Sequence, residues 1–81
     1  MFIVMKTVSW LAVGRPLTGV GVEEVFTNQN KAMIYIGRKL EELKKDDKYD
    51  NVDGQYPQII AHDKKVDEWI QYYVQEKKVT I

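Results

Sequence analysis

Hydrophobic and polar positions alternate along the first part of the chain in the pattern of β-strands. Residues 2–13 carry β-branched and aromatic side chains on both faces of an extended chain, which is typical of a strand inside a sheet. Residues 14–19 contain two glycines and a proline, so we expect the chain to reverse there. Residues 20–26 predict a second strand, and the adjacent Glu23 and Glu24 indicate an edge strand that charge protects from further pairing.

The clearest periodic segment is the amphipathic stretch of residues 28–45, which predicts a long helix. Thr27 and Asn28 offer side-chain oxygens to the free amides of a helix start. At about 100° per residue, five apolar residues fall within the stripe that faces a core: Ala32, Met33, Ile36, Leu40 and Leu43. Two lysines suit the negative end of the helix dipole, so we expect the helix to end near Asp46.

Helix and strand signals overlap in the remainder of the chain. Residues 46–57 are polar and acidic and contain an Asp-Gly turn dipeptide, so they predict a long loop. Residues 58–62 predict a short third strand. Asp63 can then cap a second helix over residues 66–78, whose apolar stripe would be Val66, Trp69, Ile70, Tyr73 and Val74. The same stretch is dense in strand formers, so a fourth strand stays open as the alternative.

Together these elements predict a single α+β domain over residues 1–81, in the order β-β-α-β-α. We expect a three-stranded antiparallel sheet with the main helix packed on one face.

Composition narrows the class of protein. Twelve basic residues balance twelve acidic ones, so the chain lacks the positive surplus that draws proteins to nucleic acid or anionic lipid. The chain has no cysteine, which excludes disulfides, thiolate zinc sites and thiol nucleophiles and makes the cytoplasm the expected compartment. The apolar opening is far shorter than the roughly 20 residues that span a bilayer. We therefore expect no membrane association, and the zero net charge disfavours a nucleic-acid partner.

Residues with the potential for chemistry do not form a recognisable catalytic or metal site. The glycines at 14, 19 and 21 lack the lysine-serine pair of a phosphate loop, and hairpin turns explain them. An acidic run ending at Asp53-Gly54 suggests a calcium loop, but the first and twelfth ligand positions fall on Tyr49 and Ile60. His62 precedes Asp63, yet adjacent strand residues point to opposite faces. We predict no enzymatic activity, no catalytic residue, no metal and no cofactor.

Side chains outside the apolar stripes are the candidate contact residues. Ile34 lies roughly 150° from the centre of the helix stripe, where a polar residue is expected. Arg38 shares that outward surface, and tyrosines dominate binding hot spots because they combine apolar area with a polar tip. The alternative is a wider core. The predicted partner-binding residues are Ile34, Tyr35, Arg38, Tyr49, Tyr56 and Tyr72.

The junction Val22-Glu23-Glu24-Val25-Phe26-Thr27, which leads into Lys31-Ala32 and the long helix, resembles that of small accessory proteins encoded by phages and prophages. The resemblance covers residues 2–62 and rests on a hairpin, a capped helix and a returning strand. It implies a short protein that binds and modulates a host enzyme or defence factor.

These observations predict a non-catalytic protein-binding module, namely a phage-type inhibitor or modulator of a host protein. A homodimer or higher homo-oligomer is compatible with a chain this short. One alternative is an oligomer that sequesters a small ligand such as a nucleotide between Arg15, Arg38 and tyrosines. Another is a DNA mimic or nucleic-acid-associated protein, because residues 41–53 hold six carboxylates against three lysines.

Overall fold

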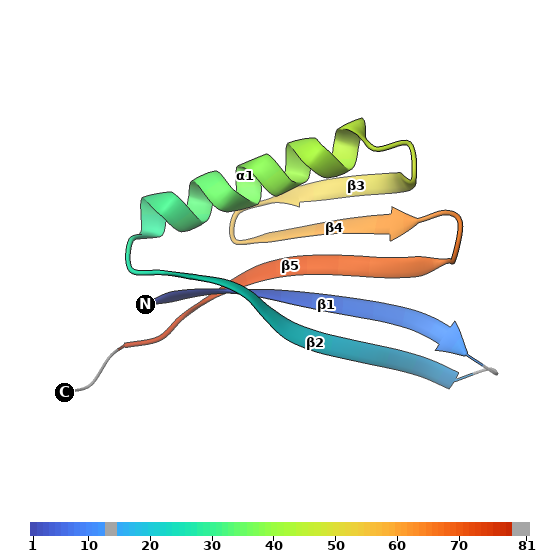
Figure 1. The fold of residues 1–81 in the computed structure, drawn as a ribbon, viewed down its shortest axis with the longest axis horizontal. Helices are drawn as coiled ribbons and strands as arrows, with labels where there is room; N and C mark the ends of the chain where they lie inside the picture. The colour runs from blue at the N-terminus through green and yellow to red at the C-terminus, as the bar shows by residue number, and fades with distance from the viewer. Residues whose placement is uncertain (13–14, 79–81) are drawn as a thin grey trace.

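The computed structural model describes residues 1–12 and 15–78, and of residues 10–12 and 15–18 it describes the backbone alone. Five strands form one antiparallel sheet in the order β2-β1-β5-β4-β3, and one helix packs on it (Figure 1). The elements, in chain order, are β1 (Phe2–Ala12), β2 (Arg15–Phe26), α1 (Gln29–Lys45), β3 (Tyr49–Gln55), β4 (Gln58–Asp63) and β5 (Glu68–Glu76). The described residues occupy an elongated plate of 46 × 28 × 15 Å.

β1 joins the β1–β2 hairpin to the other three strands of the sheet, because it pairs with β2 on one side and with β5 on the other. It pairs with β2 from Phe2–Phe26 to Ala12–Arg15, and with β5 from Phe2–Glu76 to Ser9–Trp69. The prediction of an inner strand followed by an edge strand is therefore confirmed. β2 already begins at Arg15, so the predicted turn over residues 14–19 is mostly strand, and residues 13–14 lie outside the described part of the chain.

The helix prediction is confirmed at both ends. The Asn28 side chain caps α1 by accepting a hydrogen bond from the Asn30 amide at 2.7 Å, and Asp46 is the C-cap. Ala32, Ile36 and Leu43 of the predicted stripe are buried, whereas Met33 is exposed. In the described residues α1 is the single helix, and it is neither long nor apolar enough to cross a membrane.

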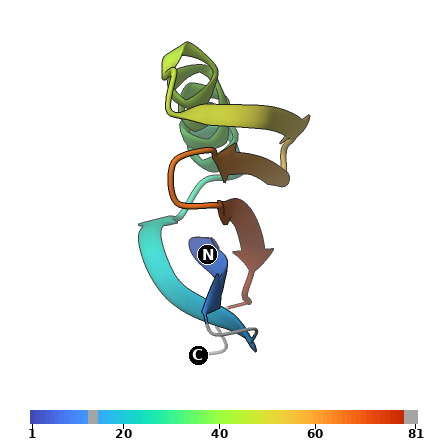
Figure 2. The same cartoon turned by 90° about the vertical axis from the view of Figure 1, so that its right-hand side faces the viewer.

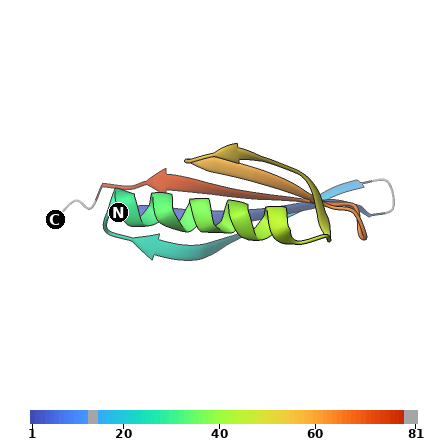
Figure 3. The same ribbon diagram turned by 90° about the horizontal axis from the view of Figure 1, so that it is seen from above.

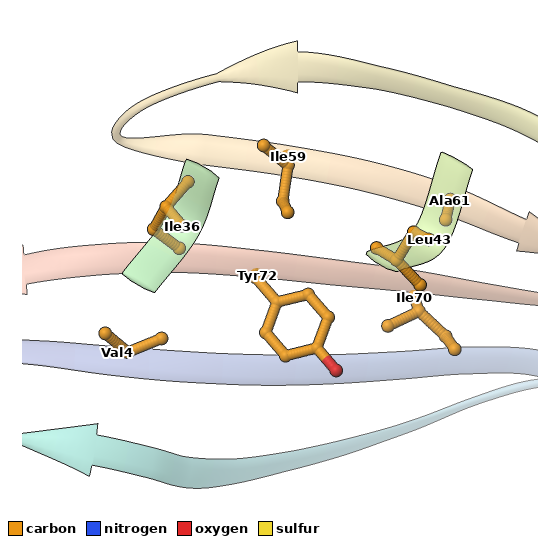
Figure 4. Packing of buried hydrophobic residues seen from close by; sticks show 7 residues of the cluster. All are labelled: Val4, Ile36, Leu43, Ile59, Ala61, Ile70 and Tyr72. Atoms are coloured by element: carbon orange, nitrogen blue, oxygen red, sulfur yellow. The ribbon is translucent and has the colours of Figure 1, made fainter. Parts of the chain in front are cut away.

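The hydrophobic core lies between α1 and one face of the sheet. Figures 2 and 3 give two further views of how the helix and the strands are arranged. Directly paired residues of antiparallel strands share a face, and Val4, Tyr72 and Ile59 share the helix-covered one. Ala61 and Ile70 continue this layer toward the other end (Figure 4). Ile36 and Leu43 of α1 pack onto it from the helix side (Figure 4).

The predicted three-stranded sheet with a second helix is wrong. Residues 49–55, predicted as part of a loop, form the edge strand β3, and residues 68–76, predicted as helix, form β5. In β5 the alternation of Ile70, Tyr72 and Val74 on one face decides the outcome, because β1 and β4 pair with it on both sides. The strand alternative for this segment was the correct one.

Asp63 caps a turn, whereas the sequence predicted that it caps a helix. Its carboxylate accepts a hydrogen bond from the Lys65 amide at 3.0 Å, and the chain then turns into β5. The side chain is 2% exposed, and Lys48 reaches it from the start of β3 at 3.3 Å. Burial by itself raises the pKa of Asp63, but the Lys65 amide and the Lys48 ammonium outweigh it, so the pKa is lowered.

Gly54, in the β3–β4 hairpin, is the glycine whose backbone excludes a side chain. Its φ is 109°, and an added Cβ would lie 2.6 Å from the Gln58 carbonyl oxygen. We predict that Gly54→Ala lowers the free energy of unfolding by at least about 1 kcal/mol, measured by urea denaturation. Gly21→Ala is the matched control, because an added Cβ there meets nothing within 4 Å. Equal stability of the two variants would contradict this account.

Candidate functional site

The exposed side of α1 carries the contact residues that the sequence predicted most sharply. Ile34 is 56% exposed, and Arg38 is exposed one helical turn further along. Met33, which the sequence assigned to the core, is 45% exposed beside Ile34. Two large apolar side chains therefore stand next to each other at the surface of a helix, with a cationic residue at their edge.

A groove of about 500 Å³ runs between this helix and the β3–β4 hairpin. Its helix wall is formed by Met33, Gly37 and Leu40, with Ile36 at the base, and its other wall is formed by Gln55 and Tyr56. The lining is mostly apolar, which is typical of a surface that receives a hydrophobic side chain. Of the predicted contact residues, Tyr56 lies in this groove.

Gly37 keeps the groove open. A glycine inside a helix costs about 0.5–1 kcal/mol relative to alanine, so it needs a reason to stand there. The fold supplies none, because an added Cβ would meet nothing within 4 Å and the φ is not in the left-handed region. The missing side chain therefore leaves space at the surface that a molecule outside the chain can enter.

The remaining predicted tyrosines take part in the packing of the domain. Tyr35 is half-buried, its ring centroid is 5.6 Å from that of Phe26, and burial raises its pKa. Tyr49 packs against the core, as does Tyr56 from the groove. Tyr72 is 6% exposed in the core cluster, so we exclude it from the contact surface. The wider core considered in the sequence analysis is thus correct for these residues.

The second candidate surface is the face of the sheet away from α1, which we call the open face. The strand register assigns to it alternate residues of β1, β2, β4 and β5. No other element of the described chain lies on this face. Its members on these strands include Ile3, Met5, Thr7, Val20, Val22, Val25, Ile60, His62, Trp69, Gln71 and Tyr73.

A histidine held between two carboxylates lies at the β3 side of the open face. His62 Nδ1 is 2.6 Å from Asp50 Oδ1, and His62 Nε2 is 2.6 Å from Asp67 Oδ1. The Trp69 ring packs against the imidazole, with ring centroids 4.7 Å apart. Both ring nitrogens can donate to carboxylates when the imidazole is charged, so this geometry favours the imidazolium. The pKa of His62 is raised above 6.5, first by the bond to Asp67 and then by that to Asp50.

The sequence missed this cluster because its members are brought together by strand pairing. Asp63, the neighbour examined from the sequence, points to the other face of β4, where it is buried. Asp50 comes from a segment that was predicted as loop, and Asp67 from the turn before β5. A correct hairpin register would have paired Asp50 with His62 and found half of the cluster.

The structure shows which elements contain the residues of the calcium-loop and phosphate-loop patterns: Asp50, Asp53 and Gly54 lie in β3, and Gly19 and Gly21 lie in β2. Asp50 is engaged by His62, and Asp53 Oδ1 accepts a hydrogen bond from the Gly54 amide. Within residues 1–12 and 15–78 no group of three or more possible ligands is arranged to hold a metal ion. Gly19 and Gly21 are residues of the strand β2, paired with Val8 and Lys6 of β1, so the prediction that hairpin turns explain them is wrong.

We predict that the His62 cluster makes stability depend on pH. The folded-state pKa is raised, so the contribution is fully present below the unfolded value near 6.5 and is lost as pH rises through the folded value. As the sole histidine, His62 can be titrated directly by NMR from about pH 5 to 9. We expect a midpoint above 6.5 that Asp67→Asn lowers, while Asp47→Asn, an exposed turn control, does not. A midpoint at or below 6.5 would refute the imidazolium assignment.

Comparisons with known proteins add no functional precedent to this geometry. No family model matches the chain, and no match was found among curated proteins or among solved structures. The function is therefore inferred from the residues of the groove and of the open face.

Proposed function

We propose that the chain is a non-catalytic protein-binding module that receives an apolar side chain of its partner in the groove beside Gly37. The observation that carries the proposal is the glycine itself. It lies in the middle of a helix, no feature of the fold requires it, and it opens the groove between Met33 and Tyr56. Close approach of another molecule to a backbone is a common reason for such a glycine.

The surroundings of the groove fit a protein partner. Met33 and Ile34 supply apolar contact area, and Tyr56 adds a ring with a polar tip. Binding energy at protein interfaces concentrates in a few such anchors surrounded by a polar rim. The groove is mostly apolar, so it suits one or two inserted apolar side chains of a larger partner better than an isolated polar metabolite.

The exposed Arg38, which follows Gly37 in α1, indicates the charge that a partner would carry. Glu42 pairs with Lys39 at 3.6 Å rather than with Arg38, and no ion pair of the described residues includes Arg38. A partner segment with an apolar residue flanked by an acidic one would fill the groove and pair with the exposed guanidinium.

The resemblance to phage and prophage proteins suggests the biological role of such a module. A small module without a catalytic group acts by occupying its target, so we place it as an inhibitor or modulator of a host enzyme or defence factor. The absence of cysteine suits the reducing cytoplasm. The nucleotide alternative has no comparable support, because none of the residues that line the groove is basic and the Arg15 side chain lies outside the described residues.

The test fills the groove without harming the fold. We predict that Gly37→Leu raises the free energy of unfolding by about 0.5–1 kcal/mol, because leucine is a better helix former. We also predict that it lowers the stoichiometric capture of a protein from bacterial lysate at least about tenfold, the effect of losing one anchor worth about 1.4 kcal/mol. Captured proteins are quantified by mass spectrometry.

Lys31→Leu is the matched control, since it introduces the same side chain at an exposed position of the same helix away from the groove. The control is expected to capture the partner as the wild type does. Capture that is equal for Gly37→Leu and wild type, or the absence of any stoichiometric partner, would count against the proposal.

A further inference from the structure

The open face breaks the alternation expected of a sheet that has water on one side. Antiparallel sheets with one solvated face carry polar residues there. Here β2 instead presents Val20, Val22 and Val25, with Val22 62% exposed. Ile3 and Met5 lie opposite two of these valines on β1, and both are half-buried. The outer two-strand region therefore presents apolar side chains on its uncovered face as well as on its covered one.

These residues form a continuous patch that crosses three strands. The register places Ile3 between Val25 and Gln75, Met5 between Val22 and Tyr73, and Thr7 between Val20 and Gln71. Trp69 continues the patch along β5. Of the large apolar side chains exposed in the described residues, half belong to this face: Val20, Val22, Val25 and Trp69.

The absence of charged side chains from the patch favours a second copy of this chain as its partner. In these rows of β2, β1 and β5 the patch contains no acidic and no basic side chain. In a two-fold interface the same surface patch of both copies is in contact, so a charged patch would meet a patch of the same charge. Two copies of this neutral patch can meet without such repulsion. A lipid surface would be recognised by cations, and this face offers none in the patch.

The charged members of the face lie at its β3 side. Asp50, His62 and Asp67 sit beyond the apolar rows, around Trp69. Asp53 lies on the same edge strand, paired with Ile60. An apolar centre with a polar margin is the usual anatomy of a protein interface.

The projected area of the face approaches the area that each partner buries in a standard interface. Five strands about 4.8 Å apart, paired over about eight residues of about 3.4 Å, span roughly 500–650 Å² in projection. Side chains standing on the sheet add to this area, and a standard interface buries about 800 Å² on each partner. Two sheets pack face to face about 10 Å apart with their strands nearly aligned.

We propose that the open face packs on the open face of a second copy of this chain, which forms a two-fold symmetric β-sandwich with a helix on each outer side. Val22, Met5 and Tyr73 of the two copies form the centre of the interface. The arrangement leaves the groove beside Gly37 accessible on each outer side, so this inference does not depend on the proposed function.

The solution mass of the full chain tests the proposal. Light scattering at about 10–100 µM, a range that resolves micromolar dimers, should give twice the 9.5 kDa chain mass. Val22→Lys and, on the inner strand, Thr7→Lys place charges in the interface and should each give a monomer with an unchanged circular dichroism spectrum. Ile34→Lys is the matched control, because it changes an equally exposed apolar residue on the helix side and should stay dimeric.

Two results would overturn the proposal. One is a wild-type chain that remains monomeric throughout the concentration range. The other is a dimer that neither Val22→Lys nor Thr7→Lys dissociates, since such a dimer would use a different surface. If one lysine variant loses its secondary structure, the other decides between these outcomes.

Discussion

The pairing of β1 with β5 holds the structure together, because it joins the two ends of the chain in the middle of the sheet. Without it the chain would consist of the β1–β2 hairpin and a separate β3–β4–β5 meander, and isolated hairpins are only marginally stable. The pairing also brings Val4 into the same core cluster as Tyr72 and Ile59, so that α1 can cover residues of β1, β5 and β4 at once. Since its partners are distant in sequence, it forms only after a large loss of chain entropy.

Local signals were sufficient where local interactions decide the structure. The helix could be predicted because its stripe and its Asn28 cap lie within a few residues of each other. β5 could not be assigned in the same way, because Asp63 and the lysines after Val74 imitate the caps of a helix. Its strand-forming residues adopt extended structure once β1 and β4 supply hydrogen bonds on both sides. β3 was missed because a polar edge strand has little hydrophobic pattern.

In the candidate site, too, local features could be predicted from the sequence, whereas features that depend on distant contacts could not. Ile34 and Arg38 were found because helical periodicity alone places them on an outer surface. The groove, in contrast, depends on Tyr56 and Gln55 of a hairpin that meets α1 only in the folded chain. Tyr72 was misplaced because its environment depends on which element it belongs to: on a helix it would point outward, and on β5 it points into the core. The role that we propose for Gly37 could be inferred only when the space around it was known.

Both outer strands of the sheet carry irregularities that limit how copies of the chain can join. In β2 the register shifts beside Glu23 and Glu24, and the Glu24 carboxylate accepts a hydrogen bond from the Val25 amide at 3.2 Å. In β3 the register shifts between Asp50 and Asp53, where Asn51 has a φ of 49°. A straight, uncharged edge would let chains add strand by strand into a fibril. Because both edges are interrupted, growth of the sheet along its hydrogen-bonding direction is opposed. The proposed pairing of two open faces would then end in a closed particle rather than a filament.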